Sequence, residues 1–114
     1  VEKRMDAIKL DLTGCQRRGD SFIRCFLATD CVNLYNGRLY VCFIPVNIDS
    51  FNKYFDVDVS LTDSDSIDIY KVDDINEVFD FLRKPIPFCR YCDWKNTKTN
   101  LAWRSSKKEI TEWT

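Results

Sequence analysis

Five cysteines are the residues of this chain whose type and spacing could do chemistry. Three lie in the first half of the chain and two form a C-x2-C motif near residue 90: Cys25, Cys31, Cys42, Cys89 and Cys92. The chain contains no histidine, so a soft metal would have to be held by thiolates. Four thiolates suit either a tetrahedral zinc ion or a 4Fe–4S cluster. The sequence therefore predicts a metal or cluster site in which four of these five cysteines are ligands.

Two other interpretations of the cysteines stay open at this level. With Cys15 the count becomes six, and an even number also fits a secreted domain held by disulfides. Buried thiols can also pack simply as small apolar groups. The C-x2-C spacing favours metal binding over disulfides, because such spacing in an intracellular protein is typical of metal or redox sites. Cys15, at the mouth of a charged loop, is predicted to be an exposed thiol without a role.

Composition excludes several classes of function. The chain has 114 residues, of which 45% are hydrophobic, and a net charge of −1. This predicts one globular domain, 1–114, with no overall charge that would favour nucleic acid or an anionic membrane. No apolar run approaches the roughly 20 residues that span a bilayer. We therefore expect a cytoplasmic protein with no membrane and no nucleic-acid partner.

Other catalytic patterns are also missing. Without histidine, no Ser-His-Asp or Cys-His pair can form. Three glycines in the whole chain leave no glycine-rich phosphate loop. The acidic residues between 56 and 68 do not have the spacing of a calcium loop, and a solvated loop is expected there.

The elements that position the cysteines centre on a hairpin. Asn36-Gly37 stands between two alternating apolar arms, which is the strongest short signal for a type I′ turn. This turn sets the register over residues 31–42, with these facing pairs: Tyr35–Arg38, Leu34–Leu39, Asn33–Tyr40, Val32–Val41 and Cys31–Cys42. Because strand side chains alternate, the leucines and valines should face the core. Cys31 and Cys42 should share the other face, close enough for both thiols to bind one ion or cluster.

The remaining pattern predicts the fold class. Strands are expected over 8–12 and 66–72, a charged loop over 16–21, and helices over 50–55, after Asp74 and after Ser106. Pro85-Ile-Pro87-Phe88 should form a stiff connector that delivers Cys89. The sequence thus predicts an α+β domain with a small antiparallel sheet built on the 31–42 hairpin, two or three short helices and a Cys-rich site.

The same residues resemble a known family. Cys25-x11-Gly37-x4-Cys42 fits the C-x9-15-G-x4-C signature of SPASM and twitch domains. These domains lie C-terminal to the catalytic barrel of many radical S-adenosylmethionine (radical SAM) enzymes. The phrases LYNGRLYVC, SFNKYF, PIPFCRYCDW and SKKEITEW together resemble the C-terminal portion of a bacterial radical SAM group. The resemblance runs from about Ile8 to Trp113.

This resemblance implies an auxiliary 4Fe–4S domain. No cysteine follows Cys92, so the chain is similar to the shortened twitch type with one cluster rather than to a full SPASM domain. The family pattern carries over to Cys25, Cys42, Cys89 and Cys92. Cys31 is a fifth thiol, and whether Cys25 or Cys31 completes the set stays open, since the hairpin register favours Cys31.

The resemblance also implies what lies outside this chain. The C-x3-C-x2-C signature of radical SAM catalysis is absent, so the chain alone is not expected to be catalytic. S-adenosylmethionine would be bound by an N-terminal barrel of the same protein, which would be its partner. The start at Val1 and the end at Thr114 within a helical pattern fit a C-terminal fragment of a longer protein. The competing hypothesis is a structural four-cysteine zinc module that mediates protein contacts.

Overall fold

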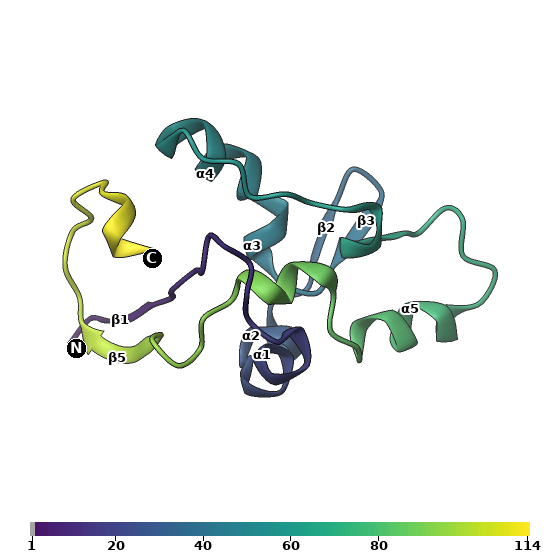
Figure 1. Cartoon of the computed structure of the whole chain (residues 1–114). Coiled ribbons are helices and arrows are strands. Elements are labelled where there is room, and N and C mark those ends of the chain that lie inside the picture. The colour runs from purple at the N-terminus through teal and green to yellow at the C-terminus, as the bar shows by residue number, and fades with distance from the viewer. Residues whose placement is uncertain (1) are drawn as a thin grey trace.

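The fold mixes short helices with two small antiparallel sheets (Figure 1). A computed structural model describes residues 2–114, except the side chain of Thr29, so Val1 of the expected 1–114 domain lies outside the described part. In chain order the elements are β1 (Arg4–Ala7), α1 (Arg18–Arg24), α2 (Leu27–Asp30), β2 (Asn33–Tyr35), β3 (Arg38–Tyr40), α3 (Phe43–Val46), α4 (Ile48–Phe55), η1 (Asp63–Asp65), β4 (Ile67–Asp68), α5 (Ile75–Leu82), η2 (Pro87–Tyr91), β5 (Lys98–Ala102) and η3 (Ile110–Glu112). This arrangement is compatible with the predicted α+β class.

The two sheets lie apart in the molecule. β1 pairs with β5 near both chain ends, and β2, β3 and β4 form a three-stranded sheet in that order. The radius of gyration is 14.8 Å, against roughly 13 Å for a compact chain of this length. Figure 1 shows why: α5 and the β1–β5 ribbon project at opposite ends. The cysteine-bearing helices lie between them.

The turn of the predicted hairpin is confirmed. Leu34 pairs with Leu39, and Tyr35 with Arg38, in the expected register. Asn36 and Gly37 have φ angles of 49° and 74°, which is the left-handed region that a type I′ turn requires. A Cβ on Gly37 would lie 2.4 Å from the Tyr70 ring, so the turn also needs glycine for space.

The prediction that the hairpin extends to Cys31 and Cys42 is wrong. β2 begins at Asn33 and β3 ends at Tyr40, so Cys31 and Cys42 do not pair as strand residues. Cys31 instead ends α2, and Cys42 begins α3. Short helices flank the hairpin instead, and apolar residues of both, Leu27, Ala28 and Ile44, are buried in the core or packed against it.

The prediction that the leucines and valines of the hairpin face the core is wrong in part. Val41 is buried, but Val32 and Leu34 are 41% and 62% exposed. A three-stranded sheet with strands of two or three residues is too small to cover its own faces. The hairpin therefore leaves apolar side chains at the surface.

The structure has more helical segments than the two or three predicted. α1 occupies residues that the sequence predicted as a charged loop, and it begins without a side-chain cap. The predicted strand over 8–12 is also displaced: β1 ends at Ala7, and only Leu10 forms an isolated bridge, with Cys92. The helix after Asp74 is confirmed as α5, with its Asp74–Glu77 capping box. Ile75, the first residue of that helix, is exposed.

A buried carboxylate ties the loop after α4 to η2. Asp65 is 1% exposed. Its Oδ1 accepts a hydrogen bond from the backbone N–H of Phe88 at 2.6 Å, and its Oδ2 accepts from the N–H of Thr62 at 2.7 Å. Phe88 is itself 1% exposed and packs in the main core. Asp65 therefore fixes the position of η2, which carries Cys89.

Replacing Asp65 with asparagine should destabilise the chain by about 2 kcal/mol, because an amide can accept at only one of the two positions and buries an unpaired N–H group at the other. Urea unfolding of Asp65→Asn against the parent chain measures this. Asp58→Asn is the control, since Asp58 is exposed and should change stability by less than about 0.5 kcal/mol. Equal stability of the two variants would contradict the role given to Asp65.

Candidate metal centre

Three of the candidate cysteines lie at the ends of the short helices near the middle of the molecule. Cys25 follows the last residue of α1, Cys31 follows α2, and Cys42 precedes α3. α3 packs beside the β2–β3 hairpin, and Figure 1 shows α1 and α2 on the other side of α3 from α4. α2 and α3 are only four residues long, and both lie between Cys25 and Val46 in the chain.

Of the other two cysteines, Cys89 lies in η2 and Cys92 directly follows it. Residues three apart lie on one side of a 3-10 helix, and Cys89 and Cys92 have this spacing. The N–H of Cys92 donates to the carbonyl of Cys89 at 3.2 Å, which closes the turn. η2 packs against α1, where the buried hydroxyl of Ser21 donates to the carbonyl of Cys92 at 2.9 Å. The C-x2-C motif is thus held beside the end of α1, which leads to Cys25.

Four of the thiols affect one another electrostatically in every pairing. Burial is the main cause that raises the pKa of Cys42 to about 12, and nearby Cys25 and Cys89 raise it further. Burial likewise raises the pKa of Cys89 to about 11, with Cys25 contributing. Burial raises the pKa of Cys92 well above its usual range, and Cys42, Cys89 and Cys25 add to the effect. All six pairs among these four cysteines therefore interact.

Cys31 stands at the edge of this group. Its thiol lies near enough to raise the pKa of Cys25 and Cys42, whereas the pKa values of Cys89 and Cys92 are raised by burial and by the other thiols. It also packs with Cys25 and Cys42 around the small cluster of Ile8 and Leu27. The fold therefore places Cys25, Cys42, Cys89 and Cys92 near one another, whereas Cys31 lies near only Cys25 and Cys42.

The thiols gather without forming a ready ligand shell. All six cysteines of the chain are free, and Cys15 is exposed as the sequence predicted. Within residues 2–114 no three Cys, Asp or Glu side chains are arranged to hold a metal ion. These findings agree, because charges interact over longer distances than a metal–sulfur bond of about 2.3 Å. As a donor set, four free thiols, of which Cys42 and Cys92 are buried and Cys25 and Cys89 half-buried, suit a soft metal or an iron–sulfur cluster.

The same electrostatics argue against thiol–disulfide chemistry. Reactive cysteines have lowered pKa values, since the thiolate is the nucleophile. Cys89 and Cys92 have the spacing of a redox motif, but burial raises the pKa of both. In this environment each keeps its proton at neutral pH. A cation that replaces the protons would change that, because it stabilises the thiolates directly.

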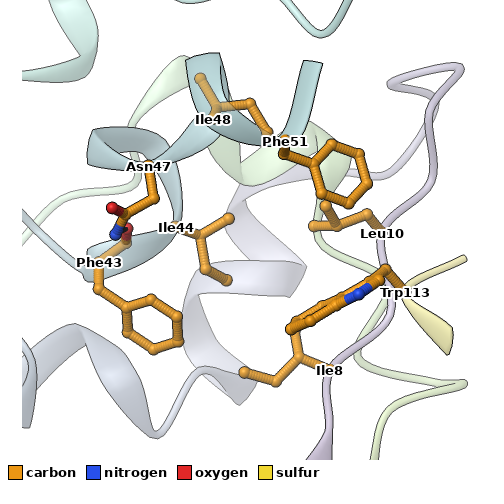
Figure 2. A pocket seen from close by; sticks show the side chains of 8 residues that line it. All are labelled: Ile8, Leu10, Phe43, Ile44, Asn47, Ile48, Phe51 and Trp113. Atoms are coloured by element: carbon orange, nitrogen blue, oxygen red, sulfur yellow. Dashed lines mark hydrogen bonds between the residues drawn. The ribbon is translucent and has the colours of Figure 1, made fainter. Parts of the chain in front are cut away.

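An apolar pocket of about 240 Å³ opens beside the cysteines. Figure 2 shows Ile44 near its middle, with Ile48 and Phe51 of α4 on one side and Ile8 and Trp113 on the other. Phe43, the residue after Cys42, also lines it. The pocket thus begins next to a candidate ligand and is closed by residues from both chain ends.

Several residues that position the site are absent from the sequence-based prediction. The α1 helix, Ser21 and Asp65 all hold η2 in place, and Arg18 lies near enough to Cys89 to lower its pKa slightly against the effect of burial. A single serine in a polar stretch carries no signal of its contact 71 residues away. The Thr62–Asp65 capping box did carry a local signal that could have marked η1.

Comparison with protein-family models, with curated proteins and with solved structures finds no match. The likeness to SPASM and twitch domains therefore rests on the residues quoted for it. In residues 2–114 the structure has no helix of the length and apolar character needed to cross a membrane.

The metal-free chain should lose stability as the pH rises. The pKa of Cys42 is about 12 in the folded chain against an ordinary value of 9.0. The unfolded chain therefore releases this proton first, and the free energy of unfolding falls between these two pH values. Urea unfolding at a series of pH values should show a slope that is shallower in Cys42→Ser by up to about 1 kcal/mol per pH unit.

The control for this measurement is Cys15→Ser, which should keep the slope of the parent chain because Cys15 is exposed. An identical slope in all three proteins would mean that Cys42 is not buried as a neutral thiol.

Proposed function

We propose that this chain is the auxiliary 4Fe–4S domain, of the twitch type, of a radical SAM enzyme. The observation that carries the proposal is the mutual interaction of Cys25, Cys42, Cys89 and Cys92. These are the four positions to which the family pattern carries over. The spacing depends on the sequence alone, whereas the proximity of the four thiols depends on tertiary packing.

In this proposal the four ligands are Cys25, Cys42, Cys89 and Cys92, and Cys31 is not a ligand. Cys25 contributes to the pKa values of Cys42, Cys89 and Cys92 alike, whereas Cys31 affects only the Cys25 and Cys42 side. A four-ligand site requires each member to reach the same centre. Cys31 is then a neighbour of the site whose thiol packs against two ligands.

The residues around these thiols would tune the bound group. A 4Fe–4S cluster supplies one-electron transfer, and its potential depends on burial and on hydrogen bonds to the sulfurs. Backbone groups of Leu27 and Ala28 hydrogen-bond to Cys25 and lower its pKa against the effect of burial. A backbone group of Ile44 does the same for Cys42. The chain thus offers both the low-dielectric surroundings and the hydrogen bonds that such a site uses.

In the parent protein, S-adenosylmethionine would be bound by an N-terminal barrel in the cytoplasm, and this domain would contact that barrel. The domain would relay an electron or hold the substrate beside the barrel. The apolar pocket next to Cys42 supports a contact or a substrate at that side of the site. The chain alone is expected to catalyse no reaction.

Anaerobic reconstitution with iron and sulfide tests the proposal. The chain should bind about four iron and four sulfide per molecule and show the broad visible absorption of a 4Fe–4S cluster. A colourless protein with one tightly held zinc per chain after this treatment would instead support the structural zinc module. A protein that binds neither would contradict both functions.

Single cysteine variants test the ligand set. Cys25→Ser, Cys42→Ser, Cys89→Ser and Cys92→Ser should each lose most of the bound iron, because each removes one thiolate from a four-thiolate site. Cys31→Ser and Cys15→Ser should retain it, with Cys15→Ser as the control for general handling. Retention by Cys25→Ser together with loss by Cys31→Ser would reverse the assignment and favour the hairpin partner of Cys42.

Loading should also stabilise the fold, since metal binding is coupled to folding. The melting temperature of the parent chain should rise on reconstitution by about 5 °C or more, as roughly 1 kcal/mol produces in a domain near this size. Cys42→Ser should show almost no rise. Comparing loaded with unloaded protein for each variant separates this effect from any packing change at residue 42.

A further inference from the structure

A polar hollow lined by residues of η2, α1 and the loops beside them is built around two arginines. It has a volume of about 410 Å³ and is lined by Arg18, Arg90, Gln16, Ser60 and Thr62, among others. This volume falls within the range of small-molecule sites, about 300–1,000 Å³. We propose that this hollow binds a phosphate monoester, with Arg18 and Arg90 holding the phosphoryl group.

The two guanidinium groups are available for an anion. Within residues 2–114 the ion pairs join Arg4–Glu2, Arg38–Asp63, Lys71–Asp68 and Arg104–Glu112, so neither arginine of the hollow takes part in one. Arginine presents paired N–H groups that match two phosphate oxygens at once. Two such side chains over one hollow suit a dianion better than a carboxylate.

Arg90 is held in place before any ligand binds. Its guanidinium lies 4.7 Å from the ring centre of Tyr91, and its Nη2 donates to the Tyr91 hydroxyl at 2.6 Å. The backbone of Gly14 packs directly over this pair. Gly14 has a φ of 67°, and a Cβ there would lie 2.8 Å from the Tyr91 ring. This glycine lets the loop close on the arginine, and a side chain fixed in this way loses little entropy on binding.

The acidic groups nearby are already engaged. Asp65 lines the hollow, but its two oxygens accept hydrogen bonds from Phe88 and Thr62 and the side chain is 1% exposed. Asp11 accepts from the side chain of Gln16 and from Thr13. Two arginines and one engaged carboxylate leave the lining with a net positive charge.

The hollow also has neutral donors for the remaining phosphate oxygens. Ser60 is exposed, and its hydroxyl forms no hydrogen bond within residues 2–114. Gln16 uses one N–H of its amide on Asp11 and retains the other. The hollow is larger than a bare phosphate needs, which leaves room for the group that carries it.

Isothermal titration of the whole chain with phenyl phosphate and with inorganic phosphate, at constant ionic strength, tests this inference. Saturable binding is expected for both, with the monoester the tighter because it fills more of the hollow. Arg18→Gln and Arg90→Gln should each weaken binding about tenfold or more. Binding of inorganic phosphate alone would overturn the monoester assignment.

Arg24→Gln is the matched control, because Arg24 lies on the same helix as Arg18 but lines a different hollow. It should change the affinity less than about twofold, whereas a loss equal to that of Arg18→Gln would mean general charge attraction and would overturn the site. Ser60→Ala provides a second variant at an exposed position in case Arg90→Gln unfolds the packing on Tyr91, and it should weaken binding about threefold or more. Absence of saturable binding in the parent chain would also overturn the proposal.

This inference does not depend on the cysteines. Cys42→Ser should bind phenyl phosphate as the parent chain does, so failure here and failure of the cluster proposal give different results.

Discussion

The packing of α1 against η2 is the contact on which the rest of the structure depends. The Ser21 hydroxyl bonds to the carbonyl of Cys92 inside this contact, and Leu10 bridges to the same residue from the N-terminal segment. These bonds bring a cysteine at the end of α1 next to a C-x2-C turn more than 60 residues later in the chain. The proximity of Cys25 and Cys89 depends on these tertiary contacts, because no single helix or hairpin contains both residues.

Burial makes the gathered thiols a stable but unreactive group. Their raised pKa values mean that each holds its proton in the apolar surroundings, and their mutual charges would oppose ionisation of more than one at a time. A soft cation or cluster removes this conflict, since it compensates all the thiolates together. The same burial makes the Cys89–Cys92 pair poorly suited to thiol–disulfide catalysis despite its C-x2-C spacing, and it leaves the cysteines suited to a bound metal group.

η2 separates two chemically different surfaces within five residues. Cys89 and Cys92 lie near Cys25, while Arg90 and Tyr91 line the polar hollow. A 3-10 helix repeats every three residues, so adjacent side chains point in different directions, and one short turn can serve both. Asp65 anchors the start of this turn through Phe88, and Gly14 allows the loop to cover its other side. Each surface is therefore supported by the same few contacts.

The sequence by itself determined what local chemistry controls. The Asn36-Gly37 turn, its register and the Asp74–Glu77 cap formed as predicted, because left-handed φ angles and side-chain caps depend on neighbouring residues alone. The cysteines and their spacing were likewise read directly. Only the tertiary structure decided how far the hairpin extends, that residues 18–24 are helical, and that Cys25 rather than Cys31 reaches all the other thiols. Those outcomes follow from packing between segments distant in the chain, where burial outweighs the weak local preference of short segments.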